Sequence, residues 1–382
     1  MDERKKVLML ATTAAMIEQF NKNNILILEE MGYEVHVIGN WKVGNPISDE
    51  RLEQFKVWLE EHHGKWFHMD STRKPYDLRN NITAYKKVVK LIREHKYAFI
   101  HCHTPIGSVI GRVAAHNTKT KVIYTAHGFH FYDGAPFINW LLYYPVEKLL
   151  SYWTDTLILI NSEDYNRAKQ RFHASKIEYV PGVGIDCQQY VNNFFSPTSK
   201  RTELGFGEED FLIISVGEIN KNKNHKVVIK AIAKIANSKV KYIICGRGNE
   251  RDKLIELAEE NGIGDRVYFL GFRDDISELL HMADLFAFPS KREGLSLALM
   301  EAMACKCPVI CSAIRGNIDL IDDEKGGYLV PTSYSIKLVE KINILANDVE
   351  KCKEMGMYNY NKVINFQIEK VMGEMKKIYE NI

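Results

Sequence analysis

The sequence predicts an α/β protein made of two Rossmann-like, doubly wound domains, and three observations favour this fold class. The chain has 382 residues, which is more than one domain usually contains and suits two domains of roughly 150 to 200 residues each. Short apolar runs recur through both halves of the chain, and helix-length segments of mixed polarity separate most of them. Apolar runs of this kind, bounded by Gly, Pro or Asn, are typical of parallel strands that are buried on both faces.

Twelve of these runs are predicted to be strands, six in each half of the chain. Those of the first half are 7–11, 34–38, 98–101, 121–125, 156–160 and 177–180. Those of the second half are 211–216, 241–245, 266–270, 285–288, 308–311 and 327–330. Because helical segments alternate with them, each half is predicted to form βαβ units around its own parallel sheet.

The segment 187–200 separates the two series and shows neither a strand nor a helix period. Its Asn-Asn and Ser-Pro-Thr-Ser content indicates a connection. We therefore expect an N-terminal domain over 1–188 and a C-terminal domain over 189–358. Apolar residues at helical spacing predict closing helices over 359–382, which return toward the N-terminal domain.

Composition excludes several classes of protein. The 51 Lys and Arg against 49 Asp and Glu give a formal net charge of +2, which is too small to favour a nucleic-acid partner. Seven cysteines at irregular spacing predict free thiols in a reducing compartment rather than a disulfide framework. The N-terminal apolar run is soon interrupted by polar residues, and no stretch reaches the roughly 20 apolar residues that span a bilayer. We expect a cytoplasmic protein that is soluble or attached to a membrane surface.

A pair of carboxylates follows the strand predicted at 285–288. Glu293 lies in a loop, a helix is predicted to begin near Leu295 or Ser296, and Glu301 follows Glu293 by eight positions. Gly294 lets backbone approach a ligand closely, and the free amides at a helix start suit a phosphate. Carboxylates accept paired hydrogen bonds from the hydroxyls of a nucleotide sugar. The alternative, a surface Glu followed by an ordinary Glu of a buried helix, stays open on these residues alone.

The segment 291–301 resembles the E-x7-E signature of retaining GT-B glycosyltransferases of family 4. The resemblance implies two Rossmann-like domains facing across a cleft, and a nucleotide-sugar donor bound by the C-terminal domain. It implies that Glu293 contacts the transferred sugar, that Glu301 contacts the ribose, and that Gly294, Leu295 and Ser296 line the donor site.

Three other stretches resemble the same family in the same order. The stretch 267–274 resembles the strand and turn that receive the nucleobase, which implies that Phe272 and Arg273 lie at the base. The stretch 244–250 resembles a glycine-containing strand end of the donor site, which implies that Gly246 is a donor-binding residue. Lys223 matches a family Lys that binds the donor diphosphate, where its charge offsets the leaving group. The usual Arg position holds Glu218 instead. Either Lys221 or another cation supplies the second charge, or the phosphates bind Lys223 and helix-end amides.

Histidines mark the N-terminal half. His127 precedes Gly128 after a predicted strand, and a lone His at such a place is more often a packed or capping residue than a catalyst. The family resemblance implies that His127 lies beside the transferred sugar, that Gly128 lies on the acceptor side, and that His103 faces the cleft from the preceding strand. We expect His130, Phe131 and Tyr132 to extend the pocket. His101 and His103 share one strand face but lack an evident third ligand, so zinc is not expected.

The acceptor is indicated by a narrower resemblance. The segment 127–148 resembles bacterial transferases that build capsular, exopolysaccharide or related glycans on polyprenyl-diphosphate carriers. This implies a glycan or polyprenyl-linked sugar as acceptor. The aromatic-rich segment 136–153 suits a bilayer interface, so we expect peripheral membrane contact there; packing of these helices on the sheet is the alternative.

The predicted function is transfer of a hexose or N-acetylhexosamine, with UDP favoured as the nucleotide by family frequency. No pair of carboxylates resembles the couple that hydrolases use, and the family needs no metal cofactor. Asp274 and Asp275 are more simply explained as helix N-capping than as a metal motif. Two alternatives remain: a nucleotide-sugar epimerase of similar shape, and a non-catalytic sugar-binding protein.

Overall fold

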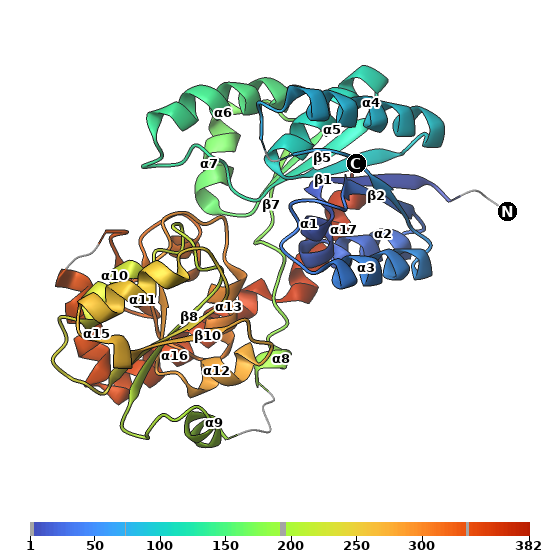
Figure 1. The fold of residues 1–382 in the computed structure, drawn as a ribbon. Helices are drawn as coiled ribbons and strands as arrows, with labels where there is room; N and C mark the ends of the chain where they lie inside the picture. The colour runs from blue at the N-terminus through green and yellow to red at the C-terminus, as the bar shows by residue number, and fades with distance from the viewer. Residues whose placement is uncertain (1–3, 73, 192–195, 334–335) are drawn as a thin grey trace. The chain divides into compact units, whose positions relative to one another are not determined.

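The computed structural model describes residues 4–72, 74–191, 196–333 and 336–382. The chain forms two compact units (Figure 1). Unit 1 comprises Met1–Val183 and Glu369–Ile382, and unit 2 comprises Gly184–Ile368.

Unit 1 is built on a seven-stranded parallel sheet in the order β3-β2-β1-β4-β5-β6-β7. Its strands are β1 Lys6–Thr13, β2 Glu34–Asn40, β3 Lys65–His68, β4 Phe99–His103, β5 Lys121–Ala126, β6 Thr156–Leu159 and β7 Lys176–Tyr179. Successive side chains of β1 alternate between two cores, Val7 and Met9 in one and Leu8 and Leu10 in the other. Because both faces are covered, the central residues 7–11 of the strand are all apolar.

Helices cover both faces of this sheet. One layer contains α1 Ala14–Phe20, α2 Lys22–Glu30, α3 Asp49–Glu61 and α17 Ile368–Glu380. The other contains α4 Leu78–His95, α5 Pro105–Thr118, α6 Phe137–Ser151 and α7 Ser162–Arg171. The last helix of the chain, red in Figure 1, therefore packs with the first helices, through Val371, Met375 and Tyr379.

Unit 2 has a six-stranded parallel sheet in the order β10-β9-β8-β11-β12-β13. Its strands are β8 Phe211–Val216, β9 Val240–Cys245, β10 Val267–Gly271, β11 Leu285–Phe288, β12 Val309–Ser312 and β13 Gly327–Val330. Its helices are α8 Gln188–Val191, α9 Pro197–Glu203, α10 Lys226–Ile232, α11 Arg251–Glu260, α12 Ile276–Met282, α13 Leu297–Ala304, α14 Asn317–Leu320, α15 Ile336–Ala346 and α16 Val349–Val363, with 3-10 turns at Gly264–Arg266 and Ile364–Phe366. One core lies under α12 and α13, and the other lies under α10, α11 and α15.

All twelve predicted strands are present, and β3 is the strand that the sequence did not predict. β3 reads KWFH and lies at the edge of its sheet, so it lacks the continuous apolar run of a strand buried on both faces. The predicted connection 187–200 instead contains α8 and the start of α9, while its residues 192–195 lie outside the described part. Ser196 caps α9 by accepting from Ser199 N, and Pro197 occupies the first turn, so this Ser-Pro sequence starts a helix.

The division between the units also differs from the predicted one. The chain enters unit 2 at Gly184 rather than at 189, because Ile185 pairs with Gln367 and exchanges backbone hydrogen bonds with Phe366 and Ile368. Of the predicted closing segment 359–382, only 369–382 belongs with unit 1. α16 stays with unit 2, because it contacts α13 there.

Two expectations about the chain as a whole concern thiols and membrane spans. All seven cysteines are free thiols, as predicted. Across the described ranges, the search for a helix both long and apolar enough to cross a bilayer finds none.

Candidate active site

The predicted donor residues gather at one edge of the sheet of unit 2. Lys223 follows β8, Gly246 follows β9, Phe272 and Arg273 follow β10, and Glu293 follows β11. Because the strands are parallel, all these loops leave from the carboxyl edge, where ligands bind in open α/β sheets.

Lys223 and Glu293 form an ion pair at this edge, although 70 residues separate them. The Nζ of Lys223 lies 2.9 Å from Oε1 of Glu293 and 4.4 Å from the centre of the Phe288 ring. Gly217 lies beside the same side chain: a Cβ there would come within 3.2 Å of Cε of Lys223. The structure thus brings together the cation predicted for the diphosphate and the carboxylate predicted for the sugar.

Two asparagines fix the loop of Lys223 to the loop of Glu293. Asn222 accepts from Lys291 N at its carbonyl (2.8 Å) and donates from Nδ2 to the carbonyl of Arg292 (2.9 Å). Asn224 donates from Nδ2 to the carbonyl of Pro289 (3.1 Å). Sequence analysis missed both residues; the signal was the Asn-Lys-Asn alternation, since short amides bond to nearby backbone in turns.

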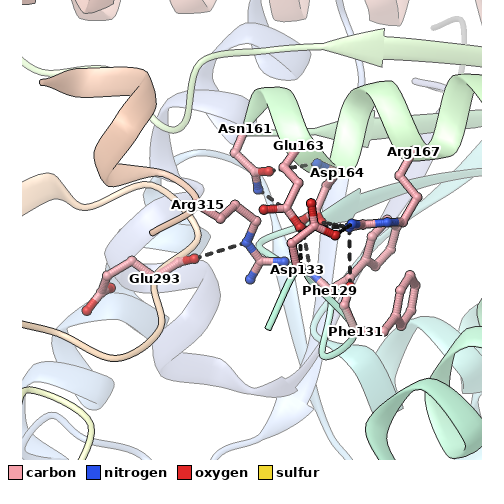
Figure 2. A network of polar contacts seen from close by, with 9 residues as sticks. All are labelled: Phe129, Phe131, Asp133, Asn161, Glu163, Asp164, Arg167, Glu293 and Arg315. Carbon is pink, nitrogen blue, oxygen red and sulfur yellow. Dashed lines mark hydrogen bonds and ion pairs between the residues drawn. The ribbon is translucent and has the colours of Figure 1, made fainter. Parts of the chain in front are cut away.

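Arg315 is a further residue that sequence analysis missed. Its Nε donates to the carbonyl of Glu293 at 3.2 Å (Figure 2). Next to it, Gly316 has φ +79°, and a Cβ there would come within 2.2 Å of the carbonyl of Gly294. The loop after β12 therefore supports the Glu293–Gly294 backbone and places a guanidinium beside it. An Arg-Gly pair after a predicted strand was the available signal.

Glu301 lies on α13, whose start was correctly predicted. Ser296 is the N-cap and its Oγ accepts from Leu299 N. The carboxylate of Glu301 accepts from the hydroxyl of Tyr190 at 2.9 Å. Burial raises the pKa of Glu301, and the hydrogen bond from Tyr190 acts in the opposite direction. Tyr190 comes from α8, 111 residues away, so no local pattern could have predicted it.

The glycines of the stretch 244–250 serve loop packing. Gly246 has φ +146°, and a Cβ there would come within 1.9 Å of the carbonyl of Gly217. At Gly248 a Cβ would come within 2.1 Å of the carbonyl of Ile219. The loops after β8 and β9 are in direct contact, which accounts for both glycines without a ligand; the predicted donor role of Gly246 stays a prediction.

After β10, Phe272 is 60% exposed, and the Arg247 guanidinium lies 5.6 Å from its ring centre. Arg273 binds the carboxylate of Asp275 with two donors, one of them at 2.7 Å, and Lys200 Nζ lies 2.7 Å from the same carboxylate. These two cations, Arg273 first, lower the pKa of Asp275 to about 2. Asp275 occupies the predicted N-cap position of α12, but its side chain makes no cap hydrogen bond to that helix.

His101, His103 and His127 form a row in unit 1, in which His101 and His103 are fully buried and His127 is partly buried. His103 Nδ1 lies 3.2 Å from His127 Nε2, and the rings of His101 and His103 are 4.1 Å apart. His101 bonds to Tyr379 Oη of α17 (2.9 Å) and to Thr125 Oγ1 (2.8 Å). Burial lowers the pKa of His101 to about 3 and of His127 to about 4, and it lowers the pKa of His103 well below its ordinary value. All three imidazoles are neutral at neutral pH.

His130 lies apart from this row. Its ring is 4.6 Å from that of Tyr143 on α6, and both line a pocket of about 260 Å³ with Thr12, Thr13 and Thr104. His127 instead lines a different pocket with Thr125 and residues of α17. The structure therefore brings His103 to His127 but places His130 elsewhere. Within the described ranges, no group of three or more His, Cys, Asp and Glu is arranged to hold a metal ion.

α7 holds the loop that carries His127 and Gly128 (Figure 2). Gly128 has φ +120°, a conformation that favours glycine. Beyond it, Phe129 N donates to Asp164 Oδ2 (3.0 Å), and Arg167 donates to the carbonyl of Phe131 (3.4 Å) and to Asp133 Oδ1 (2.6 Å). The loop is thereby fixed from one helix.

Comparison with family models matches both halves of the chain. The model described as "Glycosyl transferases group 1" matches residues 197–362. The model described as "Glycosyltransferase Family 4" matches residues 25–189.

Known proteins resemble the chain over most of its length. The Bacillus subtilis (strain 168) protein EpsD, which is named as a glycosyltransferase, is 36% identical over 98% of this chain and 96% of its own. The Escherichia coli UDP-Gal:alpha-D-GlcNAc-diphosphoundecaprenol alpha-1,3-galactosyltransferase is 27% identical over 79% of each chain. Among solved structures, Anabaena Alr3699/HepE in complex with UDP aligns over 100% of both chains with a TM-score of 0.78 and 21% identity. These findings confirm the predicted GT-B fold of two Rossmann-like units.

Proposed function

Because the chain belongs to the group 1, family 4 glycosyltransferases, we propose that it is a retaining transferase of a hexose or N-acetylhexosamine. The proposed donor is a UDP-sugar, and the proposed acceptor is a polyprenyl-diphosphate-linked glycan of bacterial surface polysaccharide synthesis. The observation that carries the proposal is the Lys223–Glu293 pair at the carboxyl edge of the unit 2 sheet.

The proposed chemistry uses charge neutralisation rather than a protein nucleophile. The ammonium of Lys223 stabilises the diphosphate as negative charge develops on it, with Arg315 as a candidate second cation in the absence of an Arg at position 218. Glu293 binds a hydroxyl of the transferred sugar, and Glu301 binds the ribose. The acceptor hydroxyl attacks from the face that the nucleotide leaves, and diphosphate oxygens assist removal of its proton.

In unit 1 we propose His127 as an active-site residue, with His103 as its hydrogen-bond partner. A neutral imidazole suits a hydrogen bond to a sugar hydroxyl, because it does not add charge where an uncharged group binds. We propose that the reaction needs no metal cofactor, since side-chain cations are at hand for the diphosphate.

The acceptor proposal rests on relatives. The name of the Escherichia coli relative specifies a diphosphoundecaprenol-linked sugar as acceptor and UDP-Gal as donor. A related acceptor is proposed here, with transfer at the inner face of the cell membrane and peripheral contact through 136–153.

The test is a panel of UDP- and GDP-sugars, each incubated with and without a polyprenyl-diphosphate sugar. Acceptor-dependent release of nucleoside diphosphate is expected, with the α-linkage of the donor retained in the product by NMR. Glu293→Gln should abolish release, whereas Glu218→Gln, at an exposed residue of the neighbouring loop, should preserve it. Isomerised sugar without acceptor would indicate an epimerase, and binding without turnover would indicate a sugar-binding protein.

A further inference from the structure

The outer side of α6 is an exposed apolar surface. Large hydrophobic side chains lie along it over the 15 residues of the helix, a length of about 22 Å. Phe137 is 80% exposed, and the others are each between 42% and 58% exposed. We call this the α6 face, formed by Phe137, Ile138, Leu141, Leu142, Val146 and Leu149.

The two charged residues of α6 do not interrupt this face. Glu147 is buried and accepts from Arg112 of α5 at 2.7 Å. Lys148 is partly buried, with Nζ 6.0 Å from the Tyr144 ring. The inner side of α6 packs on the core through Trp140, Tyr143 and Tyr144. Packing on the sheet therefore accounts for one side of α6 and leaves the other side in water.

α4 supplies a basic surface on the same layer. Residues 78–96 contain six Lys and Arg and one acidic residue, Glu94, and all seven are exposed. Lys90 pairs with Glu94 at 3.5 Å, whereas Lys86 and Arg93 form no ion pair with any described residue. A shallow groove is lined by Lys86, Lys90 and Arg93, together with Glu94.

α4 and α6 lie on the same side of the unit 1 sheet, opposite α1, α2, α3 and α17 (Figure 1). Both contact α5, which is largely buried between them. The groove lies toward α5, because Tyr85, which also lines it, accepts from Asn117 of α5 at 2.8 Å. The basic groove and the α6 face therefore belong to two helices of one layer, both of which contact α5.

We infer that the α6 face and the basic side of α4 together form a docking surface for an anionic lipid bilayer. The α6 face enters the boundary between headgroups and acyl chains, as apolar helix faces do at membranes. Lys86, Lys90 and Arg93 bind lipid phosphates beside it, since exposed basic residues next to an apolar helix are attracted to an anionic surface. The inference rests on the proposed function only in that a lipid-linked acceptor requires such contact.

The experiment is co-flotation of the full-length protein with vesicles of phosphatidylcholine alone or with phosphatidylglycerol. Leu141→Glu on the α6 face should lower partitioning of the protein onto the vesicles about tenfold. Its control is Val57→Glu, at an equally exposed residue of α3 on the opposite layer, which should lower partitioning less than about twofold. Lys86→Glu/Lys90→Glu should abolish the preference for phosphatidylglycerol, whereas Lys370→Glu/Lys377→Glu on α17 should leave it intact.

Three results would overturn the inference: wild type that stays in the soluble fraction, equal loss in the controls, or lipid-free sedimentation showing a dimer that Leu141→Glu dissociates. The last result would identify a second copy of the chain as the partner. Turnover of Leu141→Glu on a detergent-dispersed acceptor should match wild type, so a failure of docking and a failure of the proposed chemistry are distinguished.

Discussion

At the scale of single residues, the Lys223–Glu293 pair sets the electrostatics of unit 2's candidate site. Each charge currently has the other as its nearest partner at 2.9 Å. A diphosphate would offer the ammonium two further negative charges, and a sugar hydroxyl would offer the carboxylate a donor. The pair therefore holds both side chains in place before a donor arrives, which lowers the ordering cost of binding.

Lys223→Met is expected to lower kcat/KM for the donor by about 10²- to 10³-fold, the usual effect of losing one group that stabilises charge in a transition state. Lys221→Met, at an exposed residue two positions away, is the matched control and should change kcat/KM little. Steady-state kinetics with varied UDP-sugar measures both. A larger loss in the Lys221 variant would assign the diphosphate to that residue instead.

The buried histidines predict a pH dependence of stability. His101 and His127 have folded-state pKa values of about 3 and about 4, whereas an unfolded His titrates near about 6.5. Between about pH 4 and 6.5 the unfolded chain binds protons that the folded chain excludes, so the free energy of unfolding falls as pH is lowered through this window. Within this window each such His changes the free energy of unfolding by about 1.4 kcal/mol per pH unit, and above the window it adds no further change.

Urea denaturation at pH 5 and pH 8 measures this dependence. His127→Gln should reduce the difference between the free energies of unfolding at the two pH values by the contribution of one histidine. His63→Asn, at an exposed position with φ +55° that Asn tolerates, should leave that difference unchanged. An unfolding free energy of wild type that is equal at both pH values would show that the row titrates normally.

The residues of the candidate site could be predicted only in part. Lys223, Glu293 and Glu301 were predicted because each lies in a short stretch that resembles a family motif. Their partners Arg315 and Tyr190 were not, because 22 and 111 residues separate them from the groups they bind. A motif encodes the local backbone that presents a side chain; it does not encode which distant side chain meets it there.

At the scale of elements, α7 positions the loop of His127 by hydrogen bonds to backbone rather than by burial alone. Asp164 accepts from Phe129 N, and Arg167 binds the carbonyl of Phe131 and the carboxylates of Asp133 and Glu163. Since both residues lie on one rigid helix, the loop's conformation depends on α7.

Arg167→Met is expected to loosen this loop while α7 itself stays folded. The free energy of unfolding should fall by about 1 to 3 kcal/mol, because partly buried polar partners lose a charged donor. Hydrogen–deuterium exchange of residues 127–133 should rise, and kcat should fall with little change in the KM of the donor. Lys169→Met, exposed on the same helix, is the control; if it raised exchange equally, general destabilisation of α7 would explain the effect.

The elements themselves were largely predictable, for a physical reason. Strands of a sheet covered on both faces are mostly apolar over several successive positions, which gives a signal that can be seen in a single sequence. β3, at the sheet edge, carries Lys65 and His68 and loses that signal. The short helices α8 and α9 are too brief to show a 3.6-residue period, so their composition resembled a linker.

At the scale of the whole molecule, the chain returns to unit 1 after completing unit 2. α17 then fills a place in the first core, where Val371, Met375 and Tyr379 pack with Phe99, Ile123 and Ile158 of the sheet. Tyr379 also supplies the hydrogen bond to His101. The last helix of the chain therefore packs beneath the histidine row and helps to hold it in place.

A chain that ends at Ile368 is expected to lose stability in unit 1 alone. Burial of three large side chains contributes about 1.5 to 3 kcal/mol each, a sum comparable with the total stability of many domains, and His101 would lose a buried partner. Hydrogen exchange should therefore lose protection in β1, β4 and β5 while β8 and β9 keep theirs. Lys370→Glu/Lys377→Glu, which alters only exposed positions of α17, should leave both sheets protected. Uniform loss over both sheets would contradict this, because it would mean that unit 2 depends on α17 although the core residues described for unit 2 include none of that helix.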